Sequence, residues 1–475
     1  MMGMAVLRRG PTFLMLSICV ALTPCVCASA TRSPNSTLSD LTYLSRPIVN
    51  TKAFSGHGEL AFVSGSELYV LDGATRKLRH VLTGSPPPSR PSFSHDGRWL
   101  AFLRFSPKSN NYDETLWIAR GDGADPHQVA HVPPAYAVPD SGEPVYSWSP
   151  TEDELLVTTG PVTDAPLVPR EVWVVRAAGG AHRLLGPGYT NGASWSPNGR
   201  QVAVIWGGNG PADQVVETLP PSGGTPTVWL ADGDNTFYLG GWAPRFGVLV
   251  WDDEGNGGPS VENYGLPLDA IAQPGSTLVQ LATAPLFQPP AFSIGPKGEL
   301  AVVAIGPEKT ASDPDGEKFV WFDKAVETCS PLPVSCTAVS GQPSSVSLNP
   351  SISPADGSLA FVEAPQSSQG IVPAYSALQT WTQIAGWYAE HSLWMLSPGS
   401  TTPTEISDTS GAIDPVWSSR GTGIVFEKNQ GLWLLTGVGA KPMEVVSPLD
   451  FPATSSSGSY LFGYVDWTGQ FAWSG

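Results

Sequence analysis

The sequence is poor in charge, and above all in positive charge. Only 14% of its 475 residues are charged, and 25 Lys and Arg residues stand against 42 Asp and Glu residues, which gives a formal net charge of −17. Such a surface repels phosphate backbones and anionic lipid, so it argues against nucleic acid as a ligand. Apolar residues make up 41% of the chain, enough for a large core, so the scarcity of charge does not indicate disorder.

Long helices are not expected either. The chain holds 51 Gly and 47 Pro residues, which follow no Gly-x-y period. This composition excludes a collagen-like triple helix and predicts many short elements joined by turns.

The local motifs of several enzyme classes are missing. The sequence contains no His-Glu-x-x-His, no Gly-x-Ser-x-Gly and no Walker loop, and its seven histidines are scattered without metal-ligand spacing. The missing Gly-x-Ser-x-Gly and the length taken up by the repeats described below argue against a peptidase with an α/β-hydrolase domain. Catalytic groups gathered from distant segments leave no local motif, so the question of an enzyme stays open.

The first thirty residues read as an export signal. Arg8 and Arg9 precede an apolar stretch over residues 11–27, and Ala28-Ser29-Ala30 has the small-x-small pattern of a cleavage site. We expect residues 1–30 to be removed, residues 31–45 to form a tether, and the mature protein to be periplasmic or extracellular without stable insertion in a membrane. A retained anchor and lipid attachment at Cys25 are the alternatives.

Only two of the five cysteines lie outside this segment. Cys329 and Cys336 are separated by a short Pro-containing loop. In an exported protein we expect them to form a local disulfide, and two free thiols are the alternative.

A repeated pattern runs through the rest of the chain. An aromatic residue or Ile, usually followed by Ser and a turn, precedes an apolar triplet, as in Phe93 with Leu100-Ala101-Phe102. The other copies with the same spacing begin at Trp148, Trp195, Trp242, Ile352 and Trp417. Shorter copies begin at Phe54 and Ile294, and a contracted copy begins at Trp467. Successive copies lie about 40 to 65 residues apart, a period typical of propeller blades.

The phrases SFSHDGRWLAF, SWSPNGRQVAV and SISPADGSLAF resemble the TolB-type, WD40-like propeller repeat. The resemblance implies an all-β propeller of four-stranded blades, with recognition of a protein or peptide segment at one face of the channel. Nine copies with a truncated last one predict eight blades over residues 46–475, closed by the segment 460–473. Seven blades are the alternative.

The aromatic residues that open the repeats raise the question of a sugar-binding ring. Trp148, Trp195, Trp242 and Trp417 recur once per repeat at a fixed place. Packing between neighbouring blades requires such a residue, so we interpret these side chains as structural.

An insertion in the seventh repeat breaks the pattern. Residues 374–391 contain helix-forming residues with an aromatic stripe at helical spacing, which predicts a short amphipathic helix. This helix either packs on the propeller and caps the channel or binds a protein or peptide partner. The candidate partner-binding residues are Tyr375, Trp381, Trp387 and Tyr388.

One acidic segment resembles the start of a calcium loop. Asp313 and Asp315 stand at alternate positions before Gly316, so they are candidate ligands for a divalent cation such as Ca²⁺, and an ordinary acidic turn is the alternative. The sequence indicates no other cofactor.

These observations favour an exported, monomeric, non-catalytic propeller that acts as a binding or scaffolding module for a protein or other ligand. The alternative is a secreted propeller enzyme, either a metal-dependent lactonase-like hydrolase or a polysaccharide lyase or hydrolase.

Overall fold

The structure is a computed structural model, and the chain divides into two units, residues 1–36 and 37–475. The predicted signal peptide and tether lie outside the described residues. The structure describes residues 46–475 except 83–87, 106–112, 130–134, 137–145, 160–170, 185–188, 208–213, 233–235, 254–265, 285–291, 313–317, 332–333, 340, 342–344, 366–388, 438 and 451–466.

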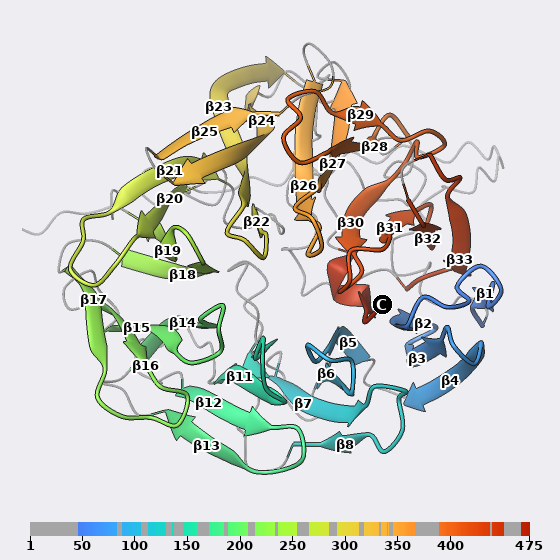
Figure 1. The fold of residues 1–475 in the computed structure, drawn as a ribbon, viewed down its shortest axis with the longest axis horizontal. Helices are drawn as coiled ribbons and strands as arrows, with labels where there is room; N and C mark the ends of the chain where they lie inside the picture. The colour runs from blue at the N-terminus through green and yellow to red at the C-terminus, as the bar shows by residue number, and fades with distance from the viewer. Residues whose placement is uncertain are drawn as a thin grey trace, which may run out of the picture. The chain divides into compact units, whose positions relative to one another are not determined.

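The second unit is a propeller of eight antiparallel blades (Figure 1), which confirms the predicted fold. The strands of each blade are given from the innermost outward. Blade 1 comprises β34 (Phe471–Trp473), β2 (Glu59–Ser64), β3 (Glu67–Asp72) and β4 (Lys77–Leu82), and blade 2 comprises β5 (Pro88–Phe93), β6 (Trp99–Phe105), β7 (Asp113–Arg120) and β8 (His127–Gln128). Blade 3 comprises β10 (Tyr146–Trp148), β11 (Glu154–Thr159), β12 (Glu171–Arg176) and β13 (Ala181–Leu184), and blade 4 comprises β14 (Tyr189–Trp195), β15 (Val202–Gly207), β16 (Gln214–Leu219) and β17 (Thr227–Asp232). β9 (Ala135–Tyr136) pairs with β7.

Blades 5 to 8 follow the same plan. Blade 5 comprises β18 (Thr236–Ala243), β19 (Gly247–Asp253), β20 (Leu266–Ile271) and β21 (Val279–Ala284), and blade 6 comprises β22 (Phe292–Ile294), β23 (Leu300–Ser312), β24 (Lys318–Pro331) and β25 (Val334–Ala338). Blade 7 comprises β26 (Ser345–Ile352), β27 (Leu359–Pro365), β28 (Ser392–Leu396) and β29 (Thr404–Glu405). Blade 8 comprises β30 (Ile413–Trp417), β31 (Ile424–Lys428), β32 (Gly431–Leu435) and β33 (Met443–Ser447), with β1 (Ile48–Val49) as a fifth strand.

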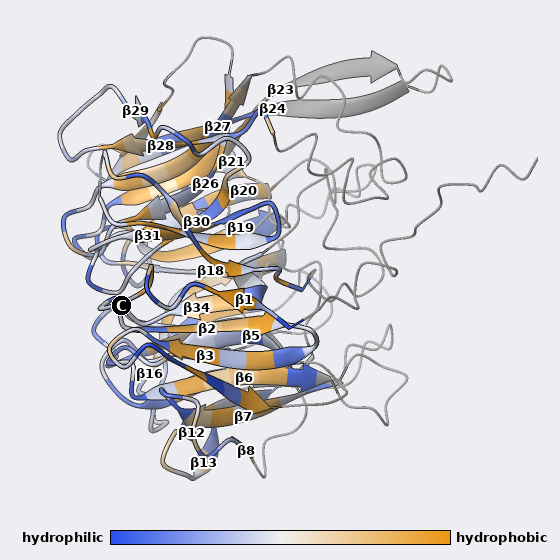
Figure 2. Cartoon of the chain, turned by 90° about the vertical axis from the view of Figure 1, so that its right-hand side faces the viewer, coloured by the Kyte–Doolittle hydropathy of each residue, from blue (hydrophilic) through white to orange (hydrophobic). Residues whose placement is uncertain are grey.

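The hydrophobic core consists of the layers between blades. The described residues form eight buried clusters, and each cluster joins two neighbouring blades, including blade 8 with blade 1. The apolar triplets of the repeat supply their centres, since Leu100-Ala101-Phe102 and Leu60-Ala61-Phe62 have no exposed surface. Figure 2 shows that hydrophobic residues lie along the strands of the blades.

The anchor tryptophans also connect the blades by hydrogen bonds. The indole N–H groups of Trp148, Trp195 and Trp417 donate to main-chain oxygens of the preceding inner strand, over 2.9 to 3.1 Å. Each accepting residue, Ser92, Ser147 or Ser351, directly precedes the anchor of its own blade. These side chains are therefore structural links and do not form a sugar-binding ring.

Both ends of the described chain take part in closing the ring. β34 pairs with β2, and Trp473 lies opposite Leu60, while β1 pairs with the outer strand β33 of blade 8. Trp473, not Phe54, is therefore the anchor residue of blade 1. The innermost strand of this blade comes from the C-terminal end of the chain. The apolar triplet of the contracted copy, Phe471–Trp473, is therefore an innermost strand, whereas the apolar triplets of the other copies lie in the second strand of their blade.

The predicted helix in the seventh repeat falls within 366–388, outside the described residues. Among the residues that the structure does describe, no helix is long and apolar enough to cross a membrane.

Candidate functional site

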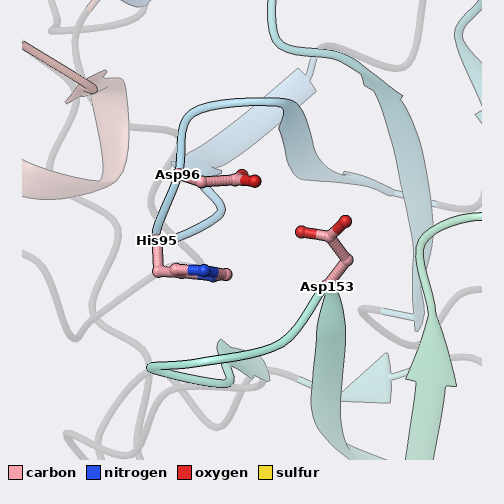
Figure 3. Close-up of side chains that lie close together, drawn as sticks. All are labelled: His95, Asp96 and Asp153. Carbon is pink, nitrogen blue, oxygen red and sulfur yellow. The ribbon is translucent and has the colours of Figure 1, made fainter.

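One group of metal-type side chains lies where the turn of blade 2 meets blade 3. His95, Asp96 and Asp153 point toward a common space (Figure 3), with one ligand atom of each within 4.8 Å of the others. His95 and Asp96 belong to the Ser-His-Asp-Gly turn between β5 and β6, and Asp153 precedes β11.

The carboxylates of this group already have structural partners. Asp96 accepts hydrogen bonds from Ser94 Oγ at 2.8 Å and from the main-chain N–H of Arg98 at 3.0 Å. Asn198 makes the same two contacts in the equivalent turn of blade 4. The Arg98 guanidinium also contacts both Asp96 and Asp153. Partial burial alone would raise the pKa of Asp96, but the hydrogen bonds from Arg98 and Ser94 outweigh it, and the pKa lies below its ordinary value.

A divalent cation here would compete with Arg98. The group joins blades 2 and 3, and we assign it a structural role.

A different set of polar residues lies on the innermost strands. Arg90, Asn349 and Asp414 each stand three residues before the anchor of their blade, at a bulge, with φ of 50°, 49° and 48°. The equivalent position of blade 4 is Gly192, with φ of 122°. Glycine adopts positive φ without strain, whereas other residues there cost about 1–3 kcal/mol, a feature often found at functional sites. Three blades therefore retain a polar side chain at an unfavourable backbone position.

Two of these residues belong to a buried network, which we call the blade 8 polar cluster: Asn349, Asp414, Glu427, Gln430 and Trp467. Asn349 Nδ2 donates to Asp414 Oδ1 at 2.9 Å, and the main-chain N–H of Trp467 donates to Asp414 Oδ2 at 2.9 Å. The main-chain N–H of Gln430 donates to Glu427 Oε1. All five residues are at least nine-tenths buried.

Glu427 is the most unusual member of this cluster. It directly follows the apolar triplet of β31, a position that holds an apolar residue in five other blades: Val63, Leu103, Ile205, Val303 and Val362. Burial raises the pKa of Glu427 well above its ordinary value, and the nearby negative charge of Asp414 raises it further, against the lowering effect of the Gln430 N–H. The surroundings of Glu427 therefore favour its protonated form over the free carboxylate.

The third bulge residue, Arg90, is half-buried and lies near the short helix that precedes β34. A Cβ built on Gly469, in the short helix η5 (Thr468–Gln470), would lie 3.6 Å from Arg90 Cγ. Behind Arg90 lies the buried Glu114, whose Oε1 accepts a hydrogen bond from Ser89 Oγ at 3.3 Å. Burial raises the pKa of Glu114, and the positive charge of Arg90 and the Ser89 contact oppose that rise. A series of contacts thus leads from Asn349 through Asp414 and Trp467 to the region of Arg90.

The structure does not bring the sequence-predicted site residues into this arrangement. Asp313 and Asp315 lie outside the described residues, between the paired strand ends Ser312 and Lys318. Tyr375, Trp381, Trp387 and Tyr388 also lie outside them. Cys329 and Cys336 face each other on β24 and β25, with sulfur atoms 1.99 Å apart.

Sequence reasoning missed the blade 8 polar cluster, although it left two signals. One is a polar residue followed by proline that begins three residues before an anchor: Arg-Pro before Phe93, Asn-Pro before Ile352 and Asp-Pro before Trp417. The other is a glutamate directly after an apolar triplet, at Glu427.

No family model and no curated protein matches the chain. Solved structures are similar to it, among them dipeptidyl peptidase 4 from Porphyromonas gingivalis (10% identity, TM-score 0.53), over 90% of this chain and 63% of that chain. The β-propeller domain of the Trilobed protease from Pyrococcus furiosus matches 75% of this chain over 96% of its own (10%, TM-score 0.41). TolB from Acinetobacter baumannii matches 57% over 61% (12%, TM-score 0.32). The chain thus spans less than two thirds of the dipeptidyl peptidase and of TolB.

At these identities the likeness establishes the propeller fold and no particular family. The comparisons nevertheless correct the functional prediction from the sequence. A non-catalytic binding or scaffolding module was favoured there, but the similar structure with a TM-score above 0.5 is that of a peptidase, dipeptidyl peptidase 4. The alternative, a propeller enzyme, agrees better with these findings.

Proposed function

We propose that the chain is an exported propeller enzyme of the hydrolase type, with its reactive groups in the blade 8 polar cluster and at Arg90. The observation that carries this proposal is Glu427, a buried carboxyl group at a position that is apolar in most other blades, beside the carboxyl group of Asp414. A buried carboxyl pair costs stability unless it holds a proton or a cation, so a functional use is the simplest reason for its presence.

The chemistry needed for hydrolysis is available in this pair. Both oxygens of Asp414 accept hydrogen bonds from N–H groups, an arrangement that favours an ionised carboxylate. Carboxylates in such an environment can orient a water molecule and accept its proton.

Arg90 supplies the positive charge of the proposed site. It is half-buried, while Glu427 is fully buried, so we expect a substrate to meet Arg90 first. A guanidinium at this place would stabilise negative charge that develops on an oxygen of the substrate. The negative charge of the buried Glu114 acts on Arg90.

The net charge narrows the substrate class. With a formal charge of −17, the protein repels polyanions, so we propose an uncharged or cationic substrate. Membership of the TolB-type repeat family is part of the same proposal, supported by the shared hydrogen bonds of the Ser94 and Ser196 turns. A protein or peptide partner and export to the periplasm or medium also remain proposals.

The test is hydrolysis of a substrate panel by the purified mature protein. The panel contains fluorogenic peptides, p-nitrophenyl esters, lactones and neutral oligosaccharides. We expect at least one class to be cleaved, and Glu427→Gln or Asp414→Asn to lower kcat/KM by about 10²-fold or more, as loss of a general acid or base does.

The matched control is Asp153→Asn, which removes a carboxylate from the His95 group and should leave kcat/KM near that of the wild type. Circular dichroism and thermal melting establish that each variant is folded. The proposal is wrong if no panel member is cleaved, or if the Glu427 and Asp414 variants cleave as fast as the wild type.

A further inference from the structure

We propose that the blade 8 polar cluster binds a Ca²⁺ ion through Asn349 Oδ1, the Asp414 carboxylate and Glu427 Oε2. This inference rests on the proposed function, because it concerns the same site. It names the ion that the carboxyl groups of Asp414 and Glu427 would bind. The site is separate from the acidic segment at Asp313 and Asp315.

The first observation is a set of buried polar atoms that lack partners. Among the described residues, Asn349 Oδ1, Glu427 Oε2 and Gln430 Nε2 make no hydrogen bond, although each atom is shielded from solvent. Buried polar groups are nearly always paired, because an unpaired one costs about 1–3 kcal/mol. Three such atoms in one cluster indicate a missing ligand.

The residues that carry these atoms are connected to one another through Asp414 and Glu427. The amide of Asn349 is held against Asp414 by a 2.9 Å hydrogen bond, and the negative charge of Asp414 acts on Glu427. Gln430 is joined to Glu427 through its main-chain N–H. The O and N atoms of a glutamine amide exchange places by a simple rotation, so Gln430 can present its oxygen to the same point.

Charge gives the second reason. Among the described residues, the charged group that acts on Glu427 is Asp414, which has the same sign. The neighbouring Lys428 does not compensate, because its Nζ lies 2.8 Å from the main-chain oxygen of Asp408 and over the ring of Trp433. The carboxyl group of Glu427, buried beside a group of the same sign, is stabilised by a proton or by a cation.

The donor set favours a hard cation. All candidate ligands are carboxylate or amide oxygens, which suit Ca²⁺ and do not suit soft metals. The ligands come from β26, β30 and β31, and Asp414 also receives the N–H of Trp467 in the segment that leads to β34. A bound ion would therefore stabilise the junction of blades 7 and 8 with the closing segment. In the His95 group, by contrast, Arg98 already supplies a positive charge to both carboxylates.

The test measures the ion directly and does not depend on activity. The mature protein is dialysed against a chelator and then against Ca²⁺, and its calcium content is determined by elemental analysis. We expect about one ion per chain and a melting temperature that rises by several degrees when Ca²⁺ is restored. Tb³⁺ in place of Ca²⁺ should emit when tryptophan is excited, because Trp467 is adjacent to Asp414.

The decisive variant is Glu427→Leu. It introduces the residue that blade 2 carries as Leu103, so it should fold without an ion. We expect it to lose the bound calcium, the Tb³⁺ emission and the Ca²⁺-dependent rise in melting temperature, whereas Asp153→Asn should retain all three. Binding that survives in Glu427→Leu, binding that Asp153→Asn abolishes, or a wild type that retains no calcium would each overturn the inference. Calcium binding without hydrolysis would refute the proposed function alone.

Discussion

The C-terminal strand closes the ring, and its removal should unfold the protein. Deleting residues 471–475 removes β34, which supplies the innermost strand of blade 1. It also removes Phe471 and Trp473, which are 3% and 7% exposed, and the hydrogen bond from the Trp473 indole to the main-chain oxygen of His57.

The size of the effect follows from these side chains. Loss of a buried Phe or Trp costs about 3–5 kcal/mol, so the two together account for about 6–10 kcal/mol. The whole stability of a folded domain is about 5–15 kcal/mol. The deletion also leaves β2 as an unpaired edge strand with a fully buried sequence, Leu60-Ala61-Phe62, which favours aggregation.

A truncation at the other end is the matched control. Removing the chain up to Val49 deletes β1, a two-residue strand on the outer edge of blade 8, where Ile48 is 77% exposed. We expect this change to cost about 1 kcal/mol or less. Size-exclusion chromatography and urea denaturation followed by circular dichroism compare the two proteins. A monomeric C-terminal truncation with an unchanged urea midpoint would refute the reasoning.

Three further predictions concern single groups. Trp195→Phe should lower the free energy of unfolding by about 1–3 kcal/mol, because the main-chain oxygen of Ser147 loses its indole donor. Trp195→Ala also removes the buried ring and should lower it by about 3–5 kcal/mol. Equal urea midpoints for both variants and the wild type would contradict this. Burial lowers the pKa of Lys324 from 10.5 to about 7, so the folded protein binds fewer protons than the unfolded chain between these values. The stability of the wild type relative to Lys324→Met should therefore rise with pH from about 7 to about 10, and a constant difference would show that this pKa is not lowered. Peptide mapping without reductant should link Cys329 to Cys336, and two free thiols would refute the disulfide.

The eight-bladed fold was predictable because its signal is local and repeated. An anchor, a turn and an apolar triplet recur within each blade, and every copy carries the same information about strands and burial. The assignment of Phe54 as the first anchor was wrong for a physical reason. The inner strand of blade 1 comes from the other end of the chain, so the residue opposite Leu60 is Trp473.

The blade 8 polar cluster was not predictable in the same way. Asn349 and Asp414 are 65 residues apart, and Asp414 and Trp467 are 53 apart, so only the closed ring brings them together. Each residue alone resembles a turn or strand residue. The local signals were the polar residue and proline before three of the anchors, and Glu427, which the alignment of the repeats places where five other blades have an apolar side chain.

The central claim is that the blade 8 polar cluster is the reactive site of a propeller enzyme. The most direct measurement compares hydrolysis of the substrate panel by the wild type and by Glu427→Gln, with melting curves to show that both proteins are folded. Our account predicts cleavage of at least one substrate class by the wild type and a loss of about 10²-fold or more in kcat/KM for the variant. Equal activity of the two folded proteins, or no cleavage by the wild type, would contradict it.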